Sequence, residues 1–199
     1  MRHLRQLSPE ELTAAYRDVF TEAFPPEELK PLSSMEDMIR DGVYRALGLF
    51  DQQEALGYIC LWWEENYILI DYLCVPHTRR NDGIGSELIR RTLEAYPKES
   101  VFIGEVEAPT GDAEADAIIY RRLGFYARSG AVTLGYDSAL FGVHYKTIAW
   151  SSSPLDEAEV LRHHHSIYKK HFSPAAFAAH IQIPLHPGEA IYPRKQWEQ

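Results

Sequence analysis

The stretch Val75–Leu88 decides the fold, and it reads VPHTRRNDGIGSEL. It follows the run YILIDYLC at 67–74, which is almost entirely apolar and therefore predicts a strand that is buried on both faces at the centre of a sheet. A helical pattern begins at Gly83 and continues to about Tyr96. The stretch is thus a basic loop that connects a buried strand to a helix.

This loop has the composition of a phosphate-binding turn. Arg80, Gly83 and Gly85 form the pattern Arg-x-x-Gly-x-Gly at the start of the helix. Backbone N–H groups at a helix N-terminus point to one place, the helix dipole favours an anion there, and glycines let a ligand come close. Arg79 and Arg80 add positive charge, and Ser86 can supply a hydroxyl. The pattern predicts a pyrophosphate cradle, with an ordinary glycine-rich turn as the alternative.

Two other nucleotide-binding sites are excluded by the same residues. In a dinucleotide site a third glycine follows the first two, and here Leu88 occupies its place. The first glycine also stands several residues after the strand, because the basic loop intervenes. The lysine of a Walker-type loop is absent as well.

The rest of the chain alternates strand and helix patterns. Ser8-Pro9-Glu10-Glu11 is a capping box that begins a helix, and Pro25-Pro26 ends it. A strand, helix and strand across 67–107 favour a parallel strand pair with a crossover helix. The other expected elements are a short helix over 33–42, strands over 43–50, 56–64, 101–107 and 143–150, a helix over 113–123 ending at Gly124, a strand from about Phe125, a helix capped by Ser153 and a short helix from Ser173.

Two segments resemble the GNAT N-acetyltransferase superfamily. Val75–Leu88 is similar to its acetyl-CoA-binding motif, with Arg80, Gly83 and Gly85 at the signature positions. The run IYRRLGF at 119–125 is similar to the family's Tyr-x-x-x-Gly-Phe. The order of elements from about residue 8 to 150 also fits, whereas 151–199 lies outside the resemblance. We therefore expect a GNAT domain over 1–150 and a helical C-terminal extension over 151–199 that packs on it.

The resemblance implies a fold and a reaction. The fold is α/β, with a mixed, mostly antiparallel central sheet, a splayed parallel strand pair and flanking helices. The reaction is transfer of an acetyl group from acetyl-CoA to a primary amine by direct attack in a ternary complex, with an N–H near Cys74 or Val75 stabilising the oxyanion. We expect no metal. The expected cofactor contacts are Leu73, Cys74, Val75, Arg80, Asn81, Asp82, Gly83, Ile84, Gly85 and Ser86.

Two residues are the candidates for proton transfer. The resemblance makes Tyr120 the general acid that protonates the departing thiolate, and the alternative is a tyrosine packed on its own helix. An attacking amine must also lose a proton. Glu105 is the first choice as base, with Glu107 on the same strand face and Asp71 on the neighbouring strand as rivals. A solvated or ion-paired Glu105 and an ordered water as base remain open.

Three other features allow a chemical interpretation and a simpler one. Cys74 as a covalent nucleophile would need a base beside it, so a buried thiol is favoured. Consecutive histidines at 163–165 point in different directions on a helix and favour a half-exposed helix face over a metal site. Trp62, Trp63 and Tyr67 line an acceptor cleft or belong to the core.

Composition limits the partners. A net charge of −9 argues against nucleic acid, and no apolar run approaches the roughly 20 residues of a membrane span. Two cysteines in strand patterns, Cys60 and Cys74, are expected to be reduced, and the chain is expected in the cytoplasm. The expected acceptor is a small-molecule or peptide amine, and a homodimer stays open. The alternatives are a non-catalytic acyl-CoA-binding module whose C-terminal segment recruits a partner, and an interaction domain without cofactor.

Overall fold

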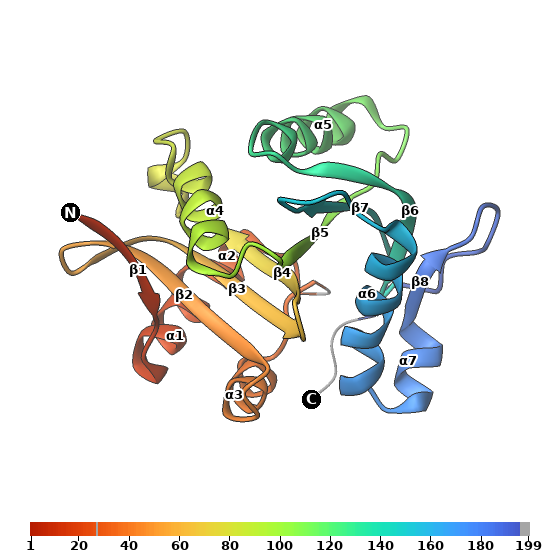
Figure 1. The fold of residues 1–199 in the computed structure, drawn as a ribbon, viewed down its shortest axis with the longest axis horizontal. Coiled ribbons are helices and arrows are strands. Elements are labelled where there is room, and N and C mark those ends of the chain that lie inside the picture. Colours follow the sequence, from red (N-terminus) through yellow and green to blue (C-terminus); the bar gives the residue numbers. More distant parts are fainter. Residues whose placement is uncertain (27, 196–199) are drawn as a thin grey trace. The chain divides into compact units, whose positions relative to one another are not determined.

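The chain forms two compact units in the computed structural model, which describes residues 1–26 and 28–195 (Figure 1). Among these residues, the first unit comprises 1–63 and 70–97, and the second comprises 64–69 and 98–195. Strand β4 (Tyr67–Cys74) contributes its first three residues to the second unit and the others to the first. Neither unit coincides with the predicted boundary at residue 150, and the division into 1–150 and 151–199 stays a prediction.

Strands and helices alternate in the first unit much as the sequence predicts. The capping box is confirmed: the Ser8 hydroxyl accepts the N–H of Glu11, and the Glu11 carboxylate accepts the N–H of Ser8. The elements are β1 (Arg2–Gln6), α1 (Pro9–Ala15), η1 (Tyr16–Phe20), α2 (Thr21–Ala23), α3 (Leu32–Arg40), β2 (Tyr44–Asp51), β3 (Glu54–Glu64), β4, η2 (His77–Arg79) and α4 (Ile84–Ala95).

Helices cover both faces of the first unit's sheet. Neighbouring residues of a strand point to opposite faces, so Gly57 and Tyr58 of β3 mark the two sides. A Cβ at Gly57 would lie 3.0 Å from a Leu88 methyl carbon of α4. On the other side, the ring of Phe20 at the end of η1 lies 5.8 Å from the Tyr58 ring. Helix α4 is therefore held on one face and the η1 region on the other.

The second unit is built on an antiparallel group of strands. Strand β7 pairs with β5 and β6, and β8 pairs with β6. The elements are β5 (Val101–Glu107), α5 (Ala113–Arg128), β6 (Val132–Leu140), β7 (Val143–Trp150), α6 (Glu157–His171), α7 (Pro174–His180) and β8 (Ile181–Leu185).

Helix α5 is longer than predicted. It passes through Gly124 and ends at Arg128, so the strand predicted from about Phe125 begins only at Val132. The reason lies at Gly130, which has φ +93° and accepts the left-handed conformation that ends many helices. A glycine inside a helix costs only about 1 kcal/mol, which the surrounding contacts offset.

The C-terminal segment contains a strand as well as helices. Helix α6 is capped by Asp156 and not by Ser153, because the Asp156 carboxylate accepts the N–H groups of Ala158 and Glu159. Ser173 caps α7, as predicted. Strand β8 was not predicted because it contains Pro184, but β8 stands at the end of the strand order, where proline is tolerated.

The fold class is confirmed. The strand order is β1-β2-β3-β4-β5-β7-β6-β8, and the sheet is mixed and mostly antiparallel, with one parallel pair. Strand β1, at the other end of this order, was not predicted because its sequence RHLRQ lacks a clear apolar alternation. In the described part of the chain, none of the helices combines the length and the apolarity needed to cross a membrane.

Candidate functional site

The predicted cradle lies at an uncapped helix N-terminus in the first unit. Helix α4 begins at Ile84, and Gly83 before it adopts φ +74°. No side chain caps this helix, and Asn81, Asp82 and Gly83 are exposed. The first-turn N–H groups of a helix have no partner within the helix, so here they are available to an anion.

The two arginines beside this helix N-terminus, Arg79 and Arg80, differ in their ion-pair partners. Arg79 forms an ion pair with Glu54 of β3. The exposed Arg80 forms no ion pair within the described residues, and its Nε lies 3.5 Å from the carbonyl oxygen of Val75. Of the two, Arg80 can turn its guanidinium toward a phosphate without breaking an ion pair.

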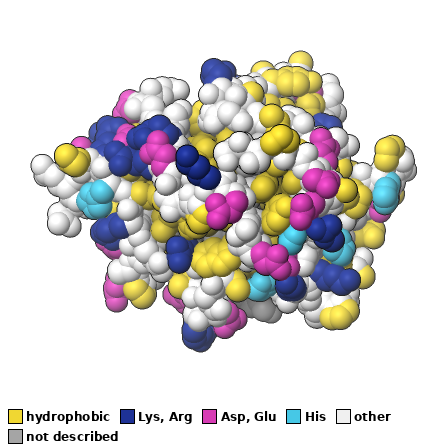
Figure 2. Space-filling model, viewed as in Figure 1, with side chains coloured by type: hydrophobic (Ala, Val, Ile, Leu, Met, Phe, Trp, Pro, Cys, Tyr) yellow, Lys and Arg dark blue, Asp and Glu magenta, His cyan; other side chains and the backbone are white. Residues whose placement is uncertain are grey.

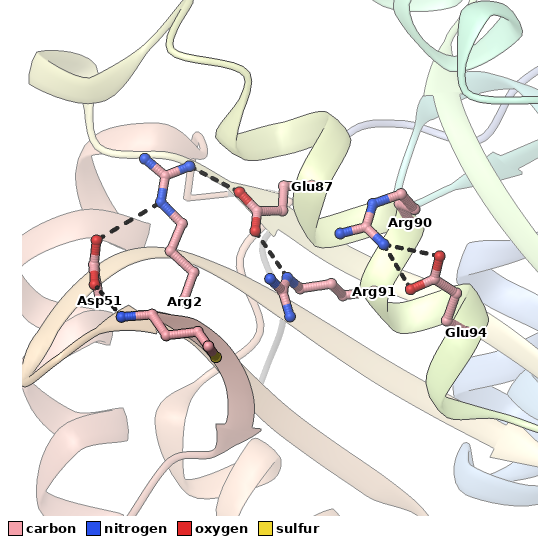
Figure 3. A network of polar contacts seen from close by, with 7 residues as sticks. Arg2, Asp51, Glu87, Arg90, Arg91 and Glu94 are labelled. Carbon is pink, nitrogen blue, oxygen red and sulfur yellow. Dashed lines mark hydrogen bonds and ion pairs between the residues drawn. The ribbon is translucent and has the colours of Figure 1, made fainter.

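The two arginines within α4 form ion pairs with carboxylates (Figure 3). Arg91 contacts Glu87 at 2.8 Å, and Arg2 of β1 contacts the same carboxylate at 2.8 Å. Arg90 pairs with Glu94 at 2.7 Å. The basic side chains that gather over α4 are interleaved with acidic ones (Figure 2). The pair of Arg2 with Glu87 joins β1 to α4, whereas Arg90 and Arg91 are paired with carboxylates of α4 itself.

The helix is also held close to the sheet. A Cβ added at Gly57 would lie 3.1 Å from Ile84 and 3.2 Å from the carbonyl oxygen of Cys74. Leu88, which takes the place of the third glycine of a dinucleotide site, is completely buried. Close packing is therefore provided by a glycine of the strand and not by a glycine of the helix.

The predicted contacts on β4 lie just before the loop. Leu73 and Val75 are half-buried, whereas Cys74 and Ile84 are buried, so these two can offer a ligand only backbone groups. Cys60 and Cys74 are both free and buried, as predicted. Burial raises the pKa of the Cys74 thiol, which suppresses the thiolate that a nucleophile needs.

Asp71 of β4 is engaged in a buried ion pair. Its Oδ1 lies 2.5 Å from Nζ of Lys30, and its Oδ2 accepts a hydrogen bond of 2.6 Å from the Tyr44 hydroxyl. The Lys30 ammonium also lies 5.0 Å from the Trp62 ring centre. Asp71 therefore has a structural role that its sequence context did not indicate. The buried Trp62 fits the core interpretation.

Glu105 of β5 lies in a second buried cluster, in the second unit. Its Oε2 accepts a hydrogen bond of 2.8 Å from the Tyr168 hydroxyl, and its Oε1 lies 2.9 Å from Nε2 of His164. The Ser138 hydroxyl lies 3.4 Å from the same Oε1. The Nδ1 of His164 lies 3.1 Å from the Tyr136 hydroxyl. Glu105 thus interacts with uncharged hydroxyls and an imidazole.

The other two candidates for proton transfer are more exposed. Glu107 forms an ion pair with Arg122 of α5. Tyr120 of α5 has 60 % of its surface exposed, so it is not packed on its own helix. An exposed phenol on a helix is free to meet a ligand, and its role as acid stays a prediction.

The three histidines of α6 have three different environments. His163 stacks on Tyr67 with ring centres 3.9 Å apart, and His165 meets Phe177 edge to face. His164 is completely buried, so the prediction of a half-exposed helix face is wrong for this residue. Nδ1 of His164 contacts Tyr136 and Nε2 contacts Glu105, and these hydrogen bonds offset the cost of burying an imidazole.

Sequence reasoning missed the partners that give the two carboxylates their environments. The sequence analysis did not assign a role to Lys30, Tyr136 or Tyr168. His164 and Tyr168 are four residues apart, a spacing that puts both on one face of a helix, and this was the one available signal. Nothing local could connect that face to β5.

Known proteins similar to this chain give a consistent answer. Residues 44–127, from β2 into α5, match the acetyltransferase (GNAT) domain family. A protein of Bacillus subtilis named "Putative acetyltransferase YjbC" is 27% identical over 149 residues, which are 71% of this chain and 72% of that protein.

Solved structures show the same fold. A GNAT-family protein of Bacteroides thetaiotaomicron has a TM-score of 0.68 at 19% identity, with 85% of this chain and 96% of that chain covered. The PaiA N-acetyltransferase of Thermoplasma acidophilum, solved in complex with coenzyme A, has a TM-score of 0.52 at 15% identity, with 76% and 99% covered. The domain match includes the loop 76–83 and α4, where the family motif was identified from the sequence. Residues 44–127 thus match the acetyltransferase (GNAT) domain family, and the chain shares its fold with solved GNAT structures.

Proposed function

We propose that this protein transfers an acetyl group from acetyl-CoA to the primary amine of a small molecule or peptide. The observation that carries the proposal is the uncapped, exposed N-terminus of α4 with Arg80 beside it. Its donor set suits a pyrophosphate, because it consists of backbone N–H groups and one guanidinium. Asp82 would contribute its backbone and not its carboxylate.

The residues proposed to bind the cofactor lie within the first unit. Arg80, Gly83, Ile84, Gly85 and Ser86 hold the phosphates of acetyl-CoA, which supplies the acetyl thioester. Backbone groups of Leu73, Cys74 and Val75 bind the rest of its chain. Support comes from the coenzyme A complex of the Thermoplasma acidophilum relative, although likeness at 15% identity establishes the fold alone.

Two side chains move the protons in this proposal. The lone pair of the neutral amine forms the new bond to the acetyl carbon, and Glu105 accepts one proton from this nitrogen as the bond forms. Tyr120 gives its proton to the sulfur as the carbon–sulfur bond breaks. The products are the amide and the CoA thiol. Water then carries the proton from Glu105 back to Tyr120. Burial of Glu105 and exposure of Tyr120 support these assignments.

Binding of acetyl-CoA is tested with a matched pair of glycine variants. Gly83 and Gly42 have φ +74° and φ +76°, and a Cβ at either one would meet nothing within 4 Å. Gly83→Ala and Gly42→Ala should each lower the free energy of unfolding by about 1 kcal/mol through backbone strain. Gly83→Ala alone should weaken acetyl-CoA binding, by about tenfold, because its Cβ enters the space where the anion binds. Calorimetric titration with acetyl-CoA measures the difference.

Transfer itself is tested by thiol release. Acetyl-CoA should raise the melting temperature, because a ligand that prefers the native state stabilises it. It should also release CoA thiol in the presence of at least one amine from a panel of diamines, aminoglycosides, amino acids and peptides. Binding without any acetylation would instead identify a non-catalytic acyl-CoA-binding module. Failure of acetyl-CoA to bind would reject both functions.

A further inference from the structure

We infer that helix α6 belongs to the catalytic machinery, because its side chains His164 and Tyr168 position Glu105 for proton transfer. The inference rests on the proposed function and adds two positioning residues to it. Helix α6 begins at Glu157, outside the residues 44–127 that match the family domain. It would therefore be a contribution of this chain's C-terminal segment.

Both oxygens of the Glu105 carboxylate are held by α6. Tyr168 donates its hydroxyl proton to Oε2 at 2.8 Å, and Nε2 of His164 lies 2.9 Å from Oε1. Two contacts on different oxygens fix the plane of the carboxylate, whereas one contact would let it rotate. His164 and Tyr168 stand one helical turn apart and are themselves almost completely buried, so their rotamers are fixed by packing.

One assignment of protons satisfies the whole cluster. A neutral imidazole has one donor and one acceptor nitrogen. If Nε2 of His164 carries the hydrogen, it donates to Glu105, and Nδ1 accepts the hydroxyl proton of Tyr136 at 3.1 Å. Burial first, and the Glu105 charge second, raise the pKa of Tyr136, so Tyr136 stays protonated as this assignment requires. In this assignment, Tyr168, Ser138 and the neutral His164 ring each donate a hydrogen bond to Glu105.

This arrangement suits a proton acceptor. Within residues 1–26 and 28–195, no lysine or arginine forms an ion pair with Glu105, whose partners are the hydroxyls of Tyr168 and Ser138 and the His164 ring. About 12 % of its side-chain surface remains exposed, which leaves an approach for a proton. Neutral donors orient the carboxylate while its oxygens keep lone pairs for another hydrogen bond.

Two tyrosine-to-phenylalanine variants separate positioning from stability. Tyr168→Phe removes a hydroxyl from Glu105, and Tyr44→Phe removes the corresponding hydroxyl from Asp71. Both should lower the melting temperature, since each leaves a buried carboxylate oxygen without its donor. We expect kcat to fall about tenfold in Tyr168→Phe, with KM for acetyl-CoA within about twofold of wild type, and kcat to stay within about twofold in Tyr44→Phe.

A conservative substitution at His164 gives the second readout. Glutamine keeps an N–H that can reach Glu105, whereas leucine fills the space without a donor. His164→Gln should retain kcat within about threefold of wild type, and His164→Leu should lose about tenfold or more at unchanged KM for acetyl-CoA. If His164→Leu does not fold, the comparison of Tyr168→Phe with Tyr44→Phe still tests the inference.

The outcomes distinguish this inference from the proposed function. Wild-type protein that acetylates no amine overturns both. Wild-type turnover together with an unchanged kcat in Tyr168→Phe overturns the inference alone and leaves α6 a structural helix. Equal losses of kcat in Tyr44→Phe and Tyr168→Phe would also overturn it, because a general loss of stability would then explain both.

Discussion

Asp71 and Glu105 are two largely buried carboxylates whose partners differ in charge. Each accepts a hydrogen bond from a buried tyrosine, Tyr44 at 2.6 Å and Tyr168 at 2.8 Å. The second oxygen of Asp71 meets an ammonium group at 2.5 Å, whereas the second oxygen of Glu105 meets an imidazole at 2.9 Å. Asp71 therefore faces a cationic side chain, whereas the partners of Glu105 are hydroxyl groups and the His164 ring.

The difference separates a structural carboxylate from a candidate for chemistry. Lys30 lies on the segment between α2 and α3, and its main chain is also held by hydrogen bonds from Tyr16 and to Tyr72. Its ion pair with Asp71 therefore fastens that segment to β4. A cation paired with a carboxylate disfavours its protonation, and within the described residues no lysine or arginine pairs with Glu105.

The largest expected effect comes from breaking the ion pair of Asp71. Lys30→Met leaves the carboxylate buried and uncompensated, which typically costs about 3–5 kcal/mol of unfolding free energy. Denaturant unfolding of wild type and variant measures the loss.

The matched control removes both charges. Because replacing a buried pair by neutral groups is often tolerated, Lys30→Met combined with Asp71→Asn should recover most of the stability. A loss below about 1 kcal/mol in Lys30→Met would show that Asp71 does not depend on its partner. Asp71 would then not be an example of a carboxylate that depends on its ion pair, and its contrast with Glu105 would be lost.

The next effect concerns Glu105 and is kinetic. Glu105→Gln keeps the size of the side chain but removes its capacity to accept a proton, so kcat should fall about 10²-fold or more. Glu107→Gln is the control, because Glu107 lies two residues further on the same strand and is neutralised by Arg122. Steady-state thiol release with a saturating amine measures both.

A specific pattern of results would contradict this assignment. If Glu107→Gln lost more activity than Glu105→Gln, the ion-paired carboxylate would be the base. If neither lost activity, an ordered water would remain as the acceptor of the proton. In both cases a neutral environment would not be what distinguishes a base in this protein.

Local signals explain what could be predicted from the sequence. The cradle depends on residues 75–88 and on the strand before them, all close in the chain, so their pattern predicted the loop and α4 correctly. Caps act over three residues, and the capping box at Ser8 and the helix start at Ser173 were identified in the same way. The predicted end of α5 was wrong because Gly124 and Gly130 both resemble helix stop signals in the sequence. Only Gly130 has a positive φ in the structure.

The roles of the carboxylates could not be predicted, because they depend on partners that are far away in the sequence. Asp71 and Lys30 are 41 residues apart, and Glu105 and His164 are 59 apart. Whether a carboxylate is neutralised depends on such partners, so Asp71, Glu105 and Glu107 could not be ranked as bases from their strand positions alone. Strands β1 and β8 were missed for a related reason, since edge strands tolerate charges and proline and lose the alternating pattern.

The smallest effect tests charge compensation at the surface. Arg5 forms a salt bridge of 2.6 Å with Glu11, and the side chains of both are more than one third exposed. The hydrogen bond from Arg5, followed by the one from the Ser8 backbone, lowers the pKa of Glu11 to about 2. Because water screens this pair, it should contribute far less to stability at pH 7 than the buried pair of Asp71.

The sign of the pH dependence follows from the lowered pKa. The stabilisation is complete above the ordinary value of 4.5 and is lost as pH falls toward about 2, because the unfolded chain then takes up a proton before the folded chain does. Glu11→Gln retains a side chain that can complete the capping box with Ser8, so it removes chiefly the pairing with Arg5. Its unfolding free energy should decline less steeply than that of wild type between pH 5 and 2. Its difference from wild type at pH 7 should shrink further in 1 M salt. A salt-independent difference larger than that of Lys30→Met would instead mean that burial does not set the strength of charge pairing in this protein.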